Sequence, residues 1–489
     1  AIGLFGQVKH IFDPAGLLNP GVLVQPRPVA ADVRPAELAG AAGATRWAAG
    51  RGRRALPLPH DGGDFSAAVH RCSGVGKCVA STAGTTRVMC PSYQATGDER
   101  DSTRGRARVL QEMVNGTVVT GGWRAGEVRE ALDLCLSCKA CSAECPVGVD
   151  MAAYKSEALH QAYRRRPRPR SHYALGQLPR WARLAARAPG AANAVLARPG
   201  LGRAARLAAG IDQRRALPPF AAQTFRSWFR QHSRDQGQPA DGTPGTPVVL
   251  LVDTFTDYFA PHIGQAAVRV LTAAGYRVTI SHRPTCCAIT WISTGQLGAA
   301  RRILRRTVGE LSGPPDVPVV GLEPSCTATL RSDAPDLLGT PEAAGLASRV
   351  RTLSELLAGT PGWTPPRLDG TAVVAQPHCH HSAVMGWDTD AALLRDAGAE
   401  LTRLGGCCGL AGNFGMERGH YEVSAAVART ALLPAVEAAG PGSAVLADGF
   451  SCRTQLADLA GQPGQHLAEL LASHLTEDRP ASQNAISEH

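Results

Sequence analysis

Four cysteines at short, fixed intervals constrain this chain more than any other feature of its sequence. They form the run Cys135-x2-Cys138-x2-Cys141-x3-Cys145, and Pro146 follows directly. At this spacing, three thiolates of one loop can face three irons of a cubane, and the proline ends regular structure behind them. A zinc site and buried free thiols are the alternatives, but four cysteines at these intervals favour an iron–sulfur cluster.

Three cysteines upstream of this run have a less regular spacing. Five residues separate Cys72 from Cys78, and Cys90 follows later, directly before a proline. Val75 stands where a second loop of the same kind would carry its middle cysteine, although the glycines beside it allow a tight loop. In two-cluster proteins the last cysteine of a run binds the other cluster. By analogy, we group one set of four ligands, Cys135, Cys138, Cys141 and Cys90, and one set of three, Cys72, Cys78 and Cys145.

The set of three does not decide what the second site binds. Three thiolates fit a three-iron cluster, a four-iron cluster with one non-cysteine ligand, or no cluster at all. The sequence therefore predicts one 4Fe-4S cluster and keeps a second cluster as an alternative.

The remaining seven cysteines lie between residues 286 and 452 in a pattern that repeats itself. An adjacent cysteine pair recurs 121 residues later, and a Ser-Cys element recurs 126 residues later. The pairs are Cys286-Cys287 and Cys407-Cys408, and the Ser-Cys elements end at Cys326 and Cys452. Adjacent cysteines form strained disulfides but can bind neighbouring metal ions. We therefore interpret both halves as ligand sets for a further iron–sulfur cluster or for zinc.

Cys379 makes the second of these halves richer in ligands than the first. In the first half the matching position, within residues 253–258, has no cysteine. His378, His380 and His381 flank Cys379, and they could serve as zinc ligands or proton carriers. For each of them the simpler interpretation is a solvated histidine in a loop.

Hydrophobic patterning predicts two kinds of structure along the chain. Helices capped by Ser102 or Thr103 and by Asp150 indicate a mainly helical domain around the first seven cysteines. Beyond residue 247, strand-like apolar runs alternate with amphipathic helices, which is typical of α/β units with a largely parallel sheet. The expected helices are 104–114, 126 onward into the cysteine run, 151–163, 295–311 and 421–439, and the expected strands are 248–252, 319–322, 373–375 and 444–447. The predicted fold class is multidomain α+β, with a ferredoxin-like helical domain followed by a duplicated α/β cysteine-rich domain.

The net charge of +10 is concentrated in one segment. Residues 164–215 contain thirteen arginines, one aspartate and neither lysine nor glutamate, which leaves a net charge of −2 for the rest of the chain. This distribution argues against a nucleic-acid-binding face. We weigh equally a solvated linker and a peripheral contact with an anionic membrane surface or an acidic partner. Fourteen cysteines without a secretory leader predict a cytoplasmic location, with any membrane contact at the inner face.

Several motifs resemble the fused FAD/iron–sulfur D-2-hydroxyacid dehydrogenases. They are the segments 71–78 (RCSGVGKC), 89–93 (MCPSY) and 102–107 (STRGRA), together with the cysteine run 135–146. The segment 12–21 is similar to the last turns of their FAD-linked oxidase domain. The paired cysteines resemble the cysteine-rich CCG domains of the glycolate oxidase iron–sulfur subunit and of heterodisulfide reductase.

This resemblance, together with composition, implies an organisation in six parts and a chain that is a piece of a longer polypeptide or a processed product. The parts are the C-terminal end of a FAD-linked oxidase domain (1–25), a linker (26–60), a 4Fe-4S ferredoxin-type domain (61–163), a basic helical connector (164–246), a duplicated CCG domain (247–475) and a disordered tail (476–489).

Complete proteins of this kind oxidise a D-2-hydroxyacid, such as D-lactate, glycolate or D-2-hydroxyglutarate, at FAD. The electrons then pass through the clusters to a quinone or an electron-carrier protein. The resemblance implies that FAD and the acid bind to a missing N-terminal part, so we assign no catalytic residue here. Two alternatives stay open: a heterodisulfide-reductase-like thiol–disulfide enzyme, and a redox protein whose CCG domain binds structural zinc.

Overall fold

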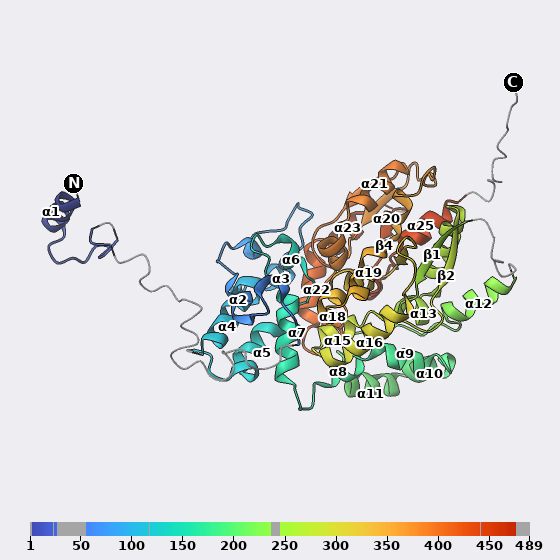
Figure 1. Ribbon diagram of the computed structural model, residues 1–489, viewed down its shortest axis with the longest axis horizontal. Helices are drawn as coiled ribbons and strands as arrows, with labels where there is room; N and C mark the ends of the chain where they lie inside the picture. The colour runs from blue at the N-terminus through green and yellow to red at the C-terminus, as the bar shows by residue number, and fades with distance from the viewer. Residues whose placement is uncertain are drawn as a thin grey trace, which may run out of the picture.

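The computed structural model describes residues 2–22, 24–26, 55–116, 118–235, 245–440 and 442–475. Most of the predicted linker 26–60 and all of the predicted tail 476–489 lie outside these residues. Helix α1 (Ile2–Phe12) stands apart from the other elements in Figure 1 and exposes its apolar side chains. The rest comprises a helical domain, an α/β region, and a helical connector that packs along the α/β region (Figure 1).

The helical domain forms as its capping residues predict. Ser102 accepts a hydrogen bond from the backbone N–H of Gly105 at the start of α4, and Asp150 accepts one from Ala153 at the start of α7. Helix α5 ends at Asp133, so the first cysteine of the run lies in the following loop. The helices are α2 (Phe65–His70), α3 (Pro91–Thr96), α4 (Thr103–Asn115), α5 (Gly126–Asp133), α6 (Ala140–Glu144) and α7 (Met151–Ala162).

The connector consists of short helices, two of which begin at a proline. They are α8 (Arg170–Ala174), α9 (Leu178–Ala185), α10 (Pro189–Ala197), α11 (Pro199–Ala209) and α12 (Phe225–Asp235). The buried guanidinium of Arg215 donates hydrogen bonds to Gly415, Ser424 and Gln455 of the α/β region. It also lies 3.3 Å from the carboxylate of Asp458. Part of the basic segment is therefore anchored in the fold rather than solvated.

His172 is buried in this connector, and we expect it to make the stability of the fold sensitive to acid. Burial, together with the charges of Arg168 and Lys155, lowers the pKa of His172 to about 3. The unfolded chain binds this proton near pH 6.5, so the stabilisation is complete above that pH and declines as the pH falls toward 3. We expect the free energy of unfolding to drop by about 1.4 kcal/mol per pH unit below 6.5.

Thermal melts between pH 7 and 5 measure this effect. His172→Gln should flatten the decline, whereas His262→Gln, at an exposed position, should leave it unchanged. Equal slopes for the two variants would contradict the assignment.

The α/β region contains two parallel sheets with the same strand order, in agreement with the predicted duplication. The first sheet runs β2-β1-β3-β4 and the second runs β6-β5-β7. After β7, residue Gln465 forms a parallel bridge with Leu446, at the place that β4 takes in the first sheet. The strands are β1 (Thr246–Leu251), β2 (Tyr276–Ile280), β3 (Val319–Gly321), β4 (Val350–Thr352), β5 (Ala372–Ala375), β6 (Glu400–Arg403) and β7 (Ala444–Leu446).

Helices cover these sheets, and the expected helix 295–311 forms as α16 (Leu297–Glu310). The expected helix 421–439 is divided at Ala431 because Pro434 cannot donate a backbone hydrogen bond to the preceding turn. The helices are α13 (Thr254–Tyr258), α14 (Pro261–Ala273), α15 (Ile289–Ser293), α16 (Leu297–Glu310), α17 (Pro324–Ala328), α18 (Ala334–Leu338), α19 (Pro341–Arg349), α20 (Leu353–Ala358), α21 (Asp388–Asp396), α22 (Tyr421–Thr430), α23 (Leu432–Ala438), α24 (Phe450–Ala460) and α25 (Leu467–Ser473). No helix among the described residues is long and apolar enough to cross a bilayer.

Polar contacts fix the helical domain against the α/β region. Lys139, inside the cysteine run, lies 2.9 Å from Asp333 of the α/β region and 3.5 Å from Asp150. Burial opposes its charge, but the two carboxylates raise the pKa of Lys139. His420 contacts Asp133 at 3.1 Å, and both regions share one hydrophobic core. The helical domain and the α/β region therefore meet at an interface with both polar and apolar contacts.

Candidate metal centres

The first centre is a cavity lined by the thiols of Cys90, Cys135, Cys138 and Cys141. Cys90 directly precedes α3, and the other three come from the loop after α5 and from α6. All four are 7–8% exposed. The structure thus brings together the four cysteines that the sequence grouped by analogy.

Burial disfavours the thiolate form of two of these side chains, Cys138 and Cys141. It raises the pKa of Cys138 and of Cys141 well above the ordinary range, and the neighbouring charges of Cys379 and Asp150 act in the same direction. A bound cation would reverse this preference, because metal ligation requires the thiolate. Four converging buried thiols are a donor set that fits a 4Fe-4S cluster.

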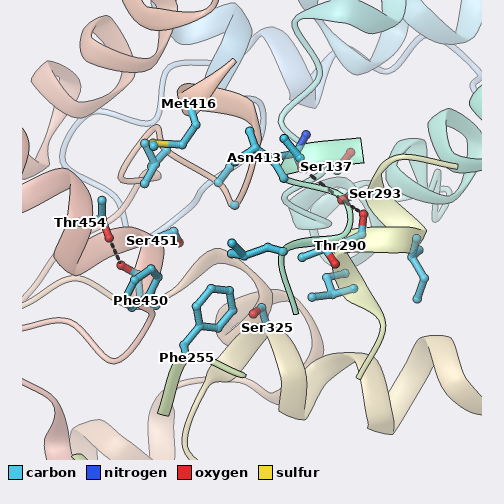
Figure 2. A pocket seen from close by; sticks show the side chains of 18 of the residues that line it. Ser137, Phe255, Thr290, Ser293, Ser325, Asn413, Met416, Phe450, Ser451 and Thr454 are labelled. Carbon is cyan, nitrogen blue, oxygen red and sulfur yellow. Dashed lines mark hydrogen bonds between the residues drawn. The ribbon is translucent and has the colours of Figure 1, made fainter. Parts of the chain in front are cut away.

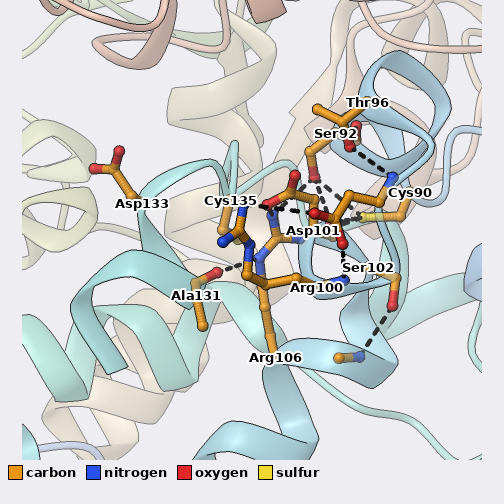
Figure 3. A network of polar contacts seen from close by, with 12 residues as sticks. Cys90, Ser92, Thr96, Arg100, Asp101, Ser102, Arg106, Ala131, Asp133 and Cys135 are labelled. Carbon is orange, nitrogen blue, oxygen red and sulfur yellow. Dashed lines mark hydrogen bonds and ion pairs between the residues drawn. The ribbon is translucent and has the colours of Figure 1, made fainter. Parts of the chain in front are cut away.

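Arg106 is a buried cation beside this centre that the sequence interpretation missed. Its guanidinium lies 3.6 Å from the Cys90 sulfur and donates to Ser92 and to the carbonyl oxygen of Ala131 (Figure 3). Burial opposes its charge, but the thiols of Cys135 and Cys90 raise the pKa of Arg106. One signal was present in the sequence: Arg106 shares a helix face with the buried Leu110, one turn later.

The second centre is the set of three, Cys72, Cys78 and Cys145. Gly74 and Gly76 have φ of +82° and +81°, so the loop between Cys72 and Cys78 makes the tight turn that the glycines predict. Burial raises the pKa of the Cys78 thiol, and the charges of Cys90 and Cys72 add to this effect.

Two arginines hold the loops of the second centre. Arg104 donates to the Gly74 carbonyl oxygen at 3.2 Å. Arg71 donates to the carbonyl oxygen of Val147 at 3.3 Å, which brings the loop after Cys145 beside Cys72. The three cysteines therefore belong to neighbouring loops.

The third centre comprises Cys379, Cys407, Cys408 and Cys452. The Cys407 thiol contacts those of Cys379 and Cys408, and contacts from Cys407 and Cys452 lower the pKa of Cys408 well below its ordinary value. Only glycine fits after the cysteine pair, because Gly409 has a φ of +87° and a Cβ there would lie 2.1 Å from a carbonyl oxygen. This centre offers four buried thiols, one of them acidic.

The fourth centre, Cys286, Cys287 and Cys326, is its counterpart in the first half. The sulfurs of Cys287 and Cys326 are 2.9 Å apart. The contact with Cys287 favours the thiolate of Cys326, yet burial and nearby carboxylates raise its pKa to about 12. The position that matches Cys379 lies in α13 and its cap, where Asp253 accepts backbone hydrogen bonds instead.

The three histidines beside Cys379 are not solvated, and that interpretation of the sequence was wrong. His378, His380 and His381 are 2–7% exposed, because the turn that begins at His381 packs against α6 of the helical domain and α17 of the first half. Burial lowers the pKa of His378 to about 3. The Nε2 atom of His380 lies 2.9 Å from the carbonyl oxygen of Ser137, inside the cysteine run of the first centre. The first and third centres are therefore direct neighbours.

A large apolar cavity of about 1020 Å³ opens next to the third centre. Phe255 and Phe450, whose rings stack at 4.6 Å, line it together with Ser451 (Figure 2). The connector contributes Trp181 to the wall. Cys379, His378 and the buried Glu323 also line it, and burial raises the pKa of Glu323 to about 7. The cavity thus joins apolar walls to polar groups beside the third centre.

Comparison with known proteins gives matches to both cysteine regions. Residues 68–149 match the 4Fe-4S dicluster domain, and residues 254–331 match the cysteine-rich CCG domain. The dicluster match covers all seven cysteines of the first and second centres.

Curated relatives extend the similarity along the chain. The D-2-hydroxyglutarate dehydrogenase of Pseudomonas putida is 26% identical over 96% of this chain and 48% of its own length. A subunit of the anaerobic glycerol-3-phosphate dehydrogenase of Escherichia coli is 29% identical over 54% of this chain and 67% of its own length. The glycolate oxidase iron-sulfur subunit of Escherichia coli is 37% identical over 16% of each chain. The chain spans about half the length of the D-2-hydroxyglutarate dehydrogenases it matches.

These matches agree with the resemblance that the motifs carry. The chain therefore contains a 4Fe-4S dicluster domain and, after it, a cysteine-rich CCG domain, and it is a distant homologue of the C-terminal half of D-2-hydroxyglutarate dehydrogenases and of the glycolate oxidase iron-sulfur subunit.

Proposed function

We propose that this chain is the iron–sulfur electron-transfer portion of a FAD-dependent D-2-hydroxyacid dehydrogenase of the lactate, glycolate or 2-hydroxyglutarate type. It receives electrons from flavin and passes them to a quinone or to an electron-carrier protein. The observation that carries this proposal is the contact between the first and third centres, where His380 bonds to Ser137 within the cysteine run. All fourteen cysteines act as metal ligands in this proposal: Cys72, Cys78, Cys90, Cys135, Cys138, Cys141, Cys145, Cys286, Cys287, Cys326, Cys379, Cys407, Cys408 and Cys452.

Clusters bound at these centres would supply one-electron transfer, and the chain's own residues would set the conditions for it. The first centre holds its thiols away from water, and Arg106 places a positive charge beside Cys90. Lys139 keeps the helical domain in register with the α/β region through Asp333. These residues act through position and charge, and none is assigned a role in oxidising the hydroxyacid.

FAD and the hydroxyacid would bind outside this chain, in a flavin domain or subunit. The relatives' greater length and the resemblance of residues 1–25 to the end of a FAD-linked oxidase domain support this part of the proposal. The exposed apolar side chains of α1 offer a surface for such a domain to cover.

A quinone is the acceptor that the apolar cavity favours. The stacked phenylalanines suit a planar quinone ring. Ser451 and His378 line the same cavity beside the third centre, where they could bind the oxygens of that ring. Connector residues form one wall of this cavity. Helices α9 to α11 of the connector expose Trp181, Leu184 and Leu201 among arginines. Apolar side chains among arginines on short helices suit peripheral contact with an anionic membrane surface, from which a lipophilic quinone would enter.

Anaerobic purification followed by iron and sulfide analysis and electron paramagnetic resonance tests the proposal. We expect iron with matching sulfide and a signal that appears on reduction with dithionite. Mixing the reduced protein with anionic vesicles that contain a quinone should then abolish the signal, and quinone-free vesicles should leave it.

The other outcomes separate the alternatives. A signal that only a soluble carrier protein abolishes would assign the acceptor to that class. A signal lost on addition of a disulfide would favour the thiol–disulfide enzyme. Zinc in place of iron and sulfide would show that the cysteine centres are structural sites.

A further inference from the structure

A cluster of three buried side chains outside the cysteine centres forms a fifth candidate site. His381 begins the π-helical turn η7 (His381–Met385), Asp390 lies in α21, and Asp448 follows β7. One ligand atom of each residue lies within 4.8 Å of one ligand atom of both others. The exposed fractions are 2%, 2% and 8%. These three groups come from separate elements, so only the tertiary fold brings them together.

The cluster leaves polar atoms without hydrogen-bond partners. Both ring nitrogens of His381 and the Oδ2 atom of Asp390 form no hydrogen bond with the residues that the structure describes. His381 Nε2 and Asp390 Oδ2 are 3.3 Å apart, an ion pair when His381 is protonated, whereas His381 Nδ1 has no partner among the described residues. An unsatisfied buried polar group costs about 1–3 kcal/mol, and charged groups cost more. Asp448 Oδ1 accepts a hydrogen bond from the backbone N–H of Leu467, but a single imidazolium cannot balance two buried carboxylates, whereas a divalent cation can.

The neighbouring histidine does not resolve this imbalance. His466 lies 3.7 Å from the Oδ1 atom of Asp448. Its Nε2 atom is already 3.0 Å from the Leu322 carbonyl oxygen, and its Nδ1 atom accepts from the backbone of Ala468. Both ring nitrogens of His466 have hydrogen-bond partners, so His466 lines the cavity and is not counted as a ligand.

A small cavity at the cluster lies where two sheets meet. It is lined by residues next to the carboxyl ends of β3, β4 and β7, the edge at which parallel sheets place their binding sites. Thr327 and Ser354 of the first half line it opposite Asp390 of the second half. A group bound here would touch both halves of the α/β region.

We propose that His381, Asp390 and Asp448 bind a divalent transition-metal ion, Zn²⁺ in the first instance. One imidazole and two carboxylates, with a further position open to water, form a nitrogen and oxygen donor set that Zn²⁺ accepts. The site has no thiol and is separate from the four cysteine centres. The ion neutralises the two carboxylates and ties α21 and the loop after β7 to the first half.

Zinc analysis and zinc X-ray absorption of the anaerobically purified protein test this site. We expect about one zinc per chain, with nitrogen and oxygen neighbours at about 2.0–2.2 Å. Asp390→Asn should lose this zinc while iron and sulfide stay constant. Asp388→Asn is the matched control, because Asp388 lies in the same helix but is solvent-exposed.

Either of two results overturns the proposal. One is a zinc content that Asp390→Asn does not change, and the other is zinc with only sulfur neighbours at about 2.3 Å, which would place it at cysteines. The absorption spectrum needs no variant, so it decides the question even where Asp390→Asn fails to fold.

Discussion

Cys138→Ala is expected to remove the cluster of the first centre and to interrupt electron flow to the third. Cys138 is buried with Cys90, Cys135 and Cys141 around one cavity, and its thiol senses the charge of Cys379 across the domain interface. Loss of a ligand should weaken metal binding by more than the 10–100-fold typical of changes to groups that only support a ligand. We expect iron to fall by about four atoms per chain, with loss of one component of the reduced spectrum.

Ser137→Ala is the control for this change. Ser137 is the neighbour of Cys138, but its contact with His380 uses the backbone carbonyl oxygen, which alanine keeps. This variant should retain wild-type iron content and spectrum. Full iron content in Cys138→Ala, measured beside that control, would exclude Cys138 as a ligand.

Arg106→Gln is expected to lower both the stability of the helical domain and the reduction potential of its cluster. The side chains of Arg106 and Asp101 are 1% and 3% exposed, and they lie 3.8 Å apart. Removal of one partner of a buried pair costs about 3–5 kcal/mol because the other charge stays uncompensated. A positive charge beside Cys90 favours the reduced, more negative cluster, so its loss shifts the potential to more negative values.

Arg108→Gln on the same helix separates these effects from a general loss of charge. The Arg108 side chain is 60% exposed and pairs with Glu112, whose side chain is 11% exposed. Pairs with a solvent-exposed partner contribute about 0–1 kcal/mol, so the melting temperature and the potential of Arg108→Gln should stay close to wild type. Redox titration followed by paramagnetic resonance, together with thermal unfolding, measures both quantities. An unchanged potential in Arg106→Gln would show that its charge does not act on the cluster.

The parts of the fold that sequence patterns predicted are those that local chemistry dictates. The caps at Ser102 and Asp150 satisfy free backbone N–H groups within one turn of the chain. Strands β1, β3, β5 and β7 were expected because their apolar runs are largely buried. Strands β2, β4 and β6 were missed. The residues of β2 and β6 are only partly buried and include charged side chains, and β4 is only three residues long.

The histidines beside Cys379 show where local reasoning fails. Nothing in their sequence neighbourhood indicates burial, because the groups that cover them come from other elements. His380 meets the loop of Ser137, 243 residues away, and His381 meets Asp390 and Asp448. The same holds for Arg106, whose spacing indicates a buried face but not the thiol it approaches.

The sequence by itself predicted the two cysteine regions that the family models match. Cysteine spacing is a local property, because one loop must present its thiolates at fixed intervals, and the repeat of paired cysteines predicted two similar halves. Only the tertiary structure decided which centres are neighbours. Cys379 approaches Cys138 and Arg106 approaches Cys90 through long-range packing of separately folded elements, whose contacts leave no periodic trace in the chain.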